Sequence, residues 1–148
     1  MNKHVLAVAS AGGHWVQLLR LIPAFENNKV SFLSTKENFG EMVLPHQFYF
    51  VRNATRWNKL GIITVFFSVL NVVRKIRPDV IVTTGAAPGL LAVIAGRLCG
   101  AKTLWIDSIA NADSLSLSGR IASIFAHQVF TQWQDLANSK FAYKGSVL

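Results

Sequence analysis

Cysteine is almost absent from this sequence. Its 148 residues include one, Cys99, in an apolar stretch with helical spacing. A single cysteine cannot form an internal disulfide, which excludes a small disulfide-stabilised fold and fits a reducing compartment. We expect this thiol to be buried and inert.

Acidic residues are also scarce. Seven Asp and Glu stand against 15 Lys and Arg, which gives a formal net charge of +8. This excess of positive charge favours a polyanionic partner: nucleic acid, anionic lipid or a phosphorylated substrate. The mean hydropathy of +0.36 is high for a soluble monomer. It favours a membrane surface or a subunit interface over nucleic acid.

Long apolar runs are missing. No segment reaches the roughly 20 apolar residues of a spanning helix, and the first apolar run is too short for a signal peptide. We therefore expect a peripheral protein at the cytoplasmic face of the cell membrane. The hydrophobic share of 51% excludes disorder, and the length fits one domain over residues 1–148.

Familiar nucleotide motifs are missing too, since there is neither a Walker sequence nor a G-x-G-x-x-G after the first strand. Instead, a strand-like run at 4–9 leads into Ser10-Ala11-Gly12-Gly13-His14 and a helix from Trp15. Adjacent glycines permit a sharp turn and leave the backbone bare, and the free N–H groups of a helix start suit phosphate. His14 either caps this corner or acts on substrate, as a general base toward a hydroxyl or as a donor to an oxygen.

Strand and helix patterns alternate along the chain. Further strands are expected at 30–34, 47–51, 79–84, 103–107 and 128–131, and helices at 15–25, 60–76, 90–99 and 119–126. Continuous apolar strands separated by helices predict an α/β fold, a Rossmann-like parallel sheet with helices on both faces. Ligands bind such sheets at the carboxyl ends of the strands. Both glycine corners, the second at 85–89, fall on that edge.

Among the carboxylates, Asp107 is the best placed, because it ends a strand at the ligand edge. Substrate contact, as a possible base, and bracing of its loop are both open. Asp79 starts its strand at the opposite edge and is expected to be a structural cap. His4, His46 and His127 show no metal-ligand spacing, so we expect neither a metal site nor a cofactor.

The predicted helix 60–76 is apolar nearly all round. Its less apolar residues recur at intervals of three and four in one narrow stripe: Gly61, Thr64, Ser68, Asn71 and Lys75. Such a helix needs cover on two sides, either the sheet and a neighbouring helix or the sheet and lipid. We predict the second arrangement. The expected membrane contacts are Arg52, Arg56, Trp57, Lys59, Phe66 and Phe67.

Several motifs together resemble one family. They are Ser10-x-Gly12-Gly13-His14, the run 78–85, the serine-rich run 114–120, Thr131-Gln132-Trp133, and Tyr143-x-Gly145-x-Val147. They resemble the membrane-associated, acceptor-side subunit of the split UDP-N-acetylglucosamine transferase of lipid-linked oligosaccharide synthesis. They are more similar still to its bacterial counterparts in capsule and exopolysaccharide synthesis. The glycine corner is shared with the single-chain lipid-intermediate transferase of peptidoglycan synthesis.

This resemblance implies the N-terminal half of a GT-B glycosyltransferase, inverting and metal-independent, that extends a polyprenyl-diphosphate-linked sugar. A separate subunit would supply the UDP-sugar site, and the other partners would be the lipid-linked acceptor and a membrane surface, not nucleic acid. We predict His14 as the catalytic residue for acceptor handling, with Asp107 second. The expected substrate contacts are Ser10, Gly12, Gly13, Gly85, Gly89, Ser108 and Asn111. The expected partner contacts are Tyr143, Gly145, Val147 and Leu148.

The sequence departs from the family pattern in three places. Gln17 stands where many relatives have a glutamate, so this position cannot serve as a base. Asp107-Ser108-Ile109-Ala110-Asn111 stands where many have Glu-Ser-x-x-Arg, which removes a cation. We also expect the basic loop and the long helix to replace the membrane anchor with which eukaryotic members often begin.

Two other classes of function stay open. One is a non-catalytic membrane scaffold that recruits the catalytic subunit. The other is a basic nucleic-acid-binding module, which the lack of a clustered aromatic platform disfavours.

Overall fold

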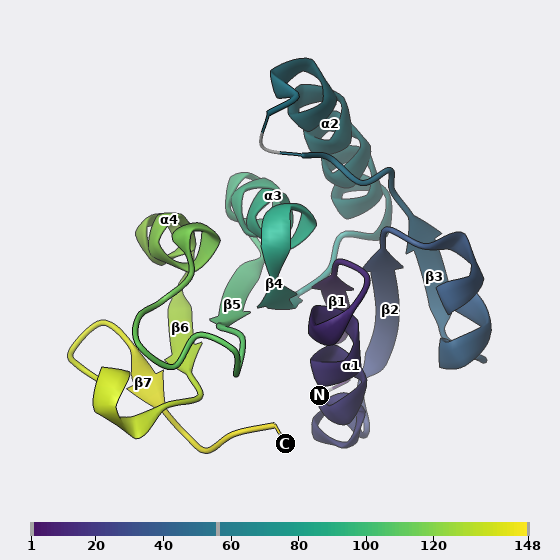
Figure 1. The fold of residues 1–148 in the computed structure, drawn as a ribbon. Coiled ribbons are helices and arrows are strands. Elements are labelled where there is room, and N and C mark those ends of the chain that lie inside the picture. Colours follow the sequence, from purple (N-terminus) through teal and green to yellow (C-terminus); the bar gives the residue numbers. More distant parts are fainter. Residues whose placement is uncertain (1, 56, 148) are drawn as a thin grey trace.

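The computed structural model describes residues 2–55 and 57–147 (Figure 1). Within these residues, seven parallel strands form one sheet in the order β3-β2-β1-β4-β5-β6-β7. The strands are β1 (His4–Ala9), β2 (Lys29–Ser34), β3 (Gln47–Phe50), β4 (Val80–Gly85), β5 (Lys102–Ile106), β6 (Gln128–Thr131) and β7 (Ala142–Tyr143). The predicted parallel α/β fold is confirmed, and β7 is an addition that the sequence did not indicate.

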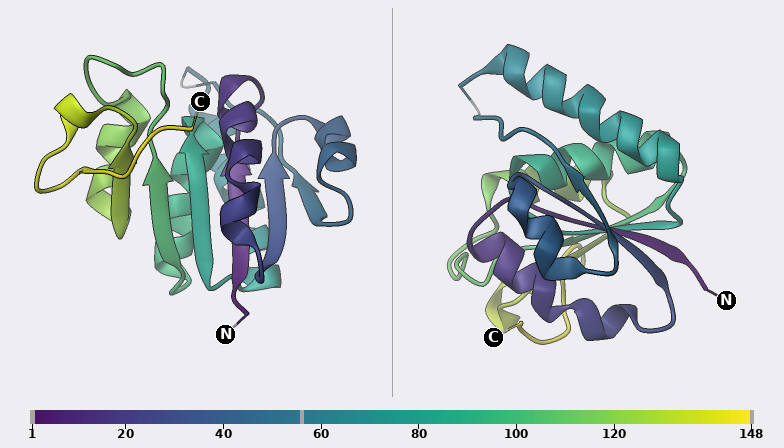
Figure 2. Two further views of the ribbon diagram at one scale, coloured as in Figure 1. Left: turned by 90° about the horizontal axis from the view of Figure 1, so that it is seen from below. Right: turned by 90° about the vertical axis from the view of Figure 1, so that its right-hand side faces the viewer.

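Helices cover both faces of the sheet (Figures 1 and 2). One face carries α2 (Lys59–Ile76), α3 (Ala86–Leu98) and α4 (Leu117–Phe125). The other face carries α1 (Gly13–Arg20) and the 3-10 turns η1 (Ile22–Phe25) and η2 (Glu37–Val43). A further 3-10 turn, η3 (Gln134–Leu136), precedes β7.

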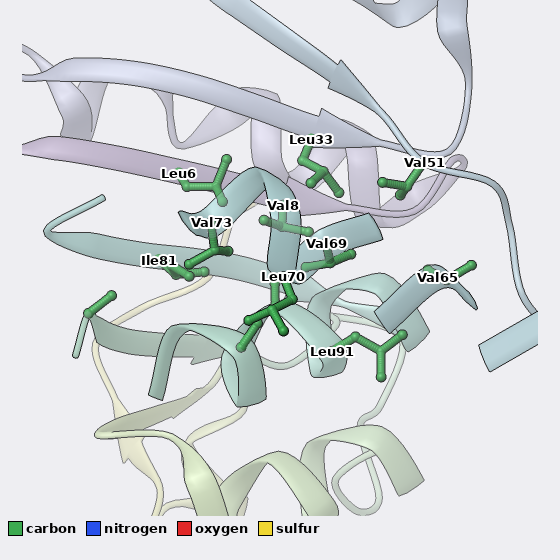
Figure 3. Close-up of a cluster of buried hydrophobic side chains, with 13 residues drawn as sticks. Leu6, Val8, Leu33, Val51, Val65, Val69, Leu70, Val73, Ile81 and Leu91 are labelled. Carbon is green, nitrogen blue, oxygen red and sulfur yellow. The ribbon is translucent and has the colours of Figure 1, made fainter. Parts of the chain in front are cut away.

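Strand β1 shows how the sequence builds this layered core. Its alternate residues Val5, Ala7 and Ala9 pack on the α1 side, whereas Leu6 and Val8 pack under α2. Figure 3 shows the second set, with side chains of β1 and α2 meeting in one cluster. Because both faces are buried, the strand reads as a continuous apolar run.

The strand order places the two glycine corners side by side. β1 pairs with β2 on one side and with β4 on the other. The chain therefore reverses its direction of winding between β1 and β4, and ligands bind doubly wound sheets at such a switch point. The corner after β1 and the corner after β4 meet at this place.

Three local predictions need correction. The helix expected at 15–25 begins two residues earlier, at Gly13, and gives way after Arg20 to η1, whose second residue is Pro23. α3 begins at Ala86, so residues 86–89 are its first turn and not a loop. Cys99 is exposed and not buried, because it follows the last residue of α3 and caps its end.

Candidate functional site

The first corner is open to solvent. Gly12 has φ +94°, a conformation that favours glycine, and Gly13 begins α1. A β-carbon added at either residue would meet no heavy atom within 4 Å from described residues beyond its immediate surroundings in the chain. Nothing in the described part of the chain therefore fills the space directly over this backbone.

The second corner touches the first through His14. Gly85 has φ +126°, and a β-carbon there would lie 2.8 Å from His14 Nδ1 and 2.9 Å from Cε1. The imidazole therefore lies directly against the backbone of Gly85. Glycine is required at this position twice over, by its backbone conformation and by the ring above it.

His14 is held by a reciprocal pair of hydrogen bonds with Thr84. The ring Nδ1 donates to the Thr84 carbonyl oxygen at 2.8 Å, and Thr84 Oγ1 donates to the His14 carbonyl oxygen at 2.6 Å. A carbonyl oxygen only accepts, so Nδ1 carries the proton of the neutral ring and Nε2 presents its lone pair. A fixed, partly buried imidazole with a free basic nitrogen can accept a proton from a hydroxyl group.

The helices that start at these corners have no capping side chain, because their N-caps are Gly12 and Gly85. α2 and α4 differ, since Asn58 and Ser116 accept hydrogen bonds from backbone N–H groups of their first turns. The first N–H groups of α1 and α3 are thus not satisfied by a cap. Two such helix starts beside a histidine suit an anionic group.

Asp107 is part of the loop structure, and its geometry contradicts the prediction that it acts as a base. It is 2% exposed. One carboxylate oxygen accepts from Trp105 Nε1 at 2.9 Å and from Ser116 Oγ at 2.7 Å; the other accepts from Asn111 Nδ2 and Ser116 N, both at 3.0 Å. With four donors the carboxylate is fully occupied. It braces the loop between β5 and α4, the second of the two interpretations open from sequence.

Three predicted substrate contacts also have structural roles, and two of them, Ser108 and Gly89, are buried. The Asn111 amide is bound to Asp107, and the buried Ser108 hydroxyl accepts from Gln17 Nε2. Gly89 lies inside α3, where a β-carbon would overlap Thr83 Oγ1, so its absent side chain allows close packing of helix on sheet. The predicted contacts that gather at the corners are Ser10, Gly12, Gly13 and Gly85.

Two buried glutamines next to this edge were not predicted as site residues. Gln17 of α1 is 6% exposed and Gln132, directly after β6, is 4% exposed. Gln132 Nε2 donates to Gln17 Oε1 at 2.6 Å. The Gln-Trp motif drew attention to Gln132, but nothing in the sequence indicates its partner 115 residues away.

The predicted membrane face is partly exposed. Arg52 and Lys59 are exposed, as are large apolar side chains from just before α2 to its middle: Trp57, Leu60, Ile63 and Phe67. Phe66 departs from the prediction, because it packs partly buried against the core with its ring centroid 5.7 Å from that of Phe67. Arg56 lies outside the described residues. No helix in the described ranges is both long and apolar enough to span a membrane.

The predicted partner segment lies along the α1 side of the sheet. Tyr143 is exposed in the edge strand β7, and Gly145 has φ +109°. Val147 receives a hydrogen bond on its carbonyl oxygen from Arg20 Nη1 at 3.1 Å and donates one from its N–H to Gln132 Oε1 at 2.8 Å. Leu148 lies outside the described residues.

Known structures share this fold. MurG of Acinetobacter baumannii superposes with a TM-score of 0.79 at 18% identity, over 99% of this chain and 46% of that chain. A UDP-N-acetylglucosamine 2-epimerase of Rickettsia bellii gives 0.74 at 16% identity, over 99% and 45%. The chain thus spans less than half of these proteins. The predicted Rossmann-like fold is confirmed, and it superposes on slightly less than half of MurG.

Sequence comparison identifies the family. The chain is 26% identical to the UDP-N-acetylglucosamine transferase subunit alg14 of Schizosaccharomyces pombe, over 92% of this chain and 78% of the relative. It is 21% identical to the corresponding subunit of Rattus norvegicus, over 97% and 82%. Residues 50–147 match the family described as "Oligosaccharide biosynthesis protein Alg14 like". The chain therefore belongs to the Alg14-like family of oligosaccharide biosynthesis proteins.

Proposed function

We propose that this chain is the acceptor-binding, membrane-associated subunit of a two-subunit UDP-sugar glycosyltransferase. The enzyme extends a polyprenyl-diphosphate-linked sugar in capsule or exopolysaccharide synthesis. Membership of a family whose relatives are named UDP-N-acetylglucosamine transferase subunits supports this proposal. The observation that carries it is the fixed imidazole of His14 between two open helix starts at the switch point of the sheet.

In the proposed reaction, an acceptor hydroxyl attacks the anomeric carbon of the UDP-sugar. The new carbon–oxygen bond forms as the bond from that carbon to the UDP oxygen breaks, and UDP leaves with the electron pair. His14 Nε2 takes the proton of the hydroxyl. The Thr84 carbonyl oxygen, 2.8 Å from Nδ1, then stabilises the positive charge of the imidazolium ring.

The same corner holds the acceptor. The bare backbone at Gly12 and Gly13 and the first N–H groups of α1 bind the diphosphate that links sugar to lipid. The partner subunit supplies the UDP-sugar site, so the reacting hydroxyl lies in a cleft between the two chains. This chain alone contributes one wall of that cleft.

A lipid-linked acceptor requires the site to lie at a membrane. The exposed side chains Trp57, Leu60, Ile63 and Phe67, here called the membrane patch, extend from just before α2 to the middle of this helix, which begins on the same edge of the sheet as the corners. Arg52 and Lys59 beside it favour anionic head groups. We therefore propose a peripheral position for this protein at the cytoplasmic face of the cell membrane.

Reconstitution tests this function. The purified chain is mixed with its candidate partner, a UDP-sugar and a polyprenyl-diphosphate-linked sugar, and transfer is followed by release of UDP. His14→Gln should lower kcat by about 100-fold or more, the usual range for loss of a general base. His46→Gln is the control, because His46 immediately precedes β3, at the opposite edge of the sheet.

Two outcomes would overturn parts of the proposal. Full turnover by this chain without a partner would refute the split enzyme. Full turnover by the His14→Gln complex would refute the general base and favour the alternative, a scaffold that only recruits the catalytic subunit to the membrane.

A further inference from the structure

The C-terminal segment, residues 144–147, follows β7 and forms neither helix nor strand. It crosses the α1 side of the sheet, and Figure 2 shows the C-terminus beside α1. Beneath it lies a cavity of about 240 Å³ whose walls include Leu21, Ile106 and Phe130. The segment therefore lies on the body of the protein without filling the apolar space below it.

The backbone N–H of Val147 connects this segment to Gln132. Gln132 Oε1 accepts from Val147 N at 2.8 Å, while its Nε2 donates to Gln17 Oε1 at 2.6 Å and to the Asp107 carbonyl oxygen at 2.9 Å. All three bonds converge on one buried amide. An amide that lost one of these partners in a buried place would have to reorient or remain unsatisfied.

Gln17 continues the connection into the loop after β5. Its Oε1 also accepts from Ile109 N at 3.1 Å, and its Nε2 donates to Ser108 Oγ at 3.1 Å. Together the two glutamines hold three consecutive residues, 107 to 109. Trp133 Nε1 adds a bond to the Ile109 carbonyl oxygen at 2.8 Å.

This loop lies next to the site. β5 pairs with β4, and the corner at Gly85 follows β4 on the same edge of the sheet. We propose that Gln17 and Gln132 are positioning residues. Through their hydrogen bonds, the position of the loop 107–111 depends on the position of the C-terminal segment. That the loop setting affects sugar transfer rests on the proposed function, whereas the coupling itself does not.

The chemistry of the two amides predicts different tolerance to the same substitution. In the native chain, Gln132 Nε2 donates hydrogen bonds to two oxygens that only accept, Gln17 Oε1 and the Asp107 carbonyl oxygen. In Gln132→Glu, a buried carboxylate oxygen would therefore face these two oxygens without a proton between them. In Gln17→Glu, the Ser108 hydroxyl can donate instead of accept, and the donors Ile109 N and Gln132 Nε2 stay in place. The first variant should break the connection, and the second should keep it.

Hydrogen exchange of the full chain, followed by NMR, tests the coupling. Val147→Pro removes the N–H that binds Gln132 and keeps the chain length. We expect exchange of the Ile109 amide to accelerate about tenfold, the effect of losing one buried hydrogen bond, and the Trp133 indole signal to shift. Ser146→Pro stiffens the same segment without removing that bond and should change neither. An unchanged Ile109 amide in Val147→Pro would overturn the proposal.

A second measurement separates this proposal from the function. In the reconstituted enzyme, Gln132→Glu should lower kcat at least fivefold with little change in the KM for UDP-sugar, while Gln17→Glu and the exposed control Gln128→Glu should retain kcat. Equal loss in Gln17→Glu and Gln132→Glu would refute the positioning role. If the unmodified complex shows no transfer, the proposed function fails, and the exchange measurement still decides the coupling.

Discussion

Replacing Gly85 by alanine tests the contact on which the site is built. Two costs are expected. Gly85 has φ +126° and ψ −168°, a region open almost only to glycine, and placing alanine there costs about 1–3 kcal/mol. The new methyl group would also lie 2.8 Å from His14 Nδ1, so the ring must move and lose its bond to Thr84. That loss adds about 1 kcal/mol.

Gly12 provides a matched control for this substitution. Its backbone has φ +94° and ψ −145°, close to the conformation of Gly85, but a β-carbon there meets no atom within 4 Å. Gly12→Ala therefore carries the backbone strain alone. The free energy of unfolding should fall further in Gly85→Ala than in Gly12→Ala, by about 1–2 kcal/mol.

Urea denaturation followed by circular dichroism measures both variants. The same substitutions in a His14→Ala background complete the test. Without the imidazole, the extra cost of Gly85→Ala should disappear, so the effects of Gly85→Ala and His14→Ala on the free energy of unfolding should not be additive. Equal destabilisation by Gly85→Ala and Gly12→Ala would show that the ring does not lie against the second corner. The hydrogen bond from His14 Nδ1 to the Thr84 carbonyl oxygen, which fixes the tautomer of the ring, would then be in doubt as well.

Asp107→Asn puts an amide N–H₂ among four donors, and it should lower the free energy of unfolding by about 1–3 kcal/mol in urea denaturation. Neutralisation of Arg52 and Lys59 together, as Arg52→Gln and Lys59→Gln, should weaken flotation with anionic vesicles by roughly 30-fold, at about 1 kcal/mol for each of the two lost positive charges. Burial, assisted by the charge of Lys29, lowers the pKa of His4 from its ordinary 6.5. The unfolded chain therefore binds this proton first, stability falls as the pH drops below 6.5 toward the folded pKa, and His4→Gln should flatten that slope.

Each of these predictions has a control and a contrary outcome. Asp135→Asn changes an exposed carboxylate and should leave stability within about 0.5 kcal/mol; an equally mild effect at Asp107 would mean that the carboxylate does not brace its loop. Lys140→Glu lowers the net charge by the same two units at an exposed position away from the membrane patch, so equal weakening of flotation would contradict a localised membrane face. A pH slope unchanged by His4→Gln would show that another group titrates in that range.

The regular parts of this fold could be predicted from sequence because their signals are local. An apolar run such as residues 4–9, followed by two glycines and the start of a helix, predicts a buried strand. Strand β7 lacked such a signal, since two residues form it. α3 begins earlier than the sequence predicts, because Gly89 resembles part of a turn but is a packing contact of the helix with Thr83.

The candidate site was predictable only in outline. His14 stands out because a titratable side chain follows two glycines, but its partner Thr84 lies 70 residues away. Asp107 illustrates the limit most clearly, since its position at the ligand edge is the same for a base and for a brace. Its four hydrogen-bond donors decide between them, and they depend on how the loop from residue 108 to Ser116 folds back.

The exposed thiol of Cys99 gives the chain a natural attachment point for a spectroscopic label. It is the one cysteine in the sequence, so a maleimide dye reacts at a single place without mutagenesis. It also lies at the far end of the 13-residue helix α3, about 20 Å along its axis from the corner at Gly85. A dye at Cys99 can therefore report how the molecule is oriented on a bilayer while the corners, the loop after β5 and the membrane patch remain unmodified.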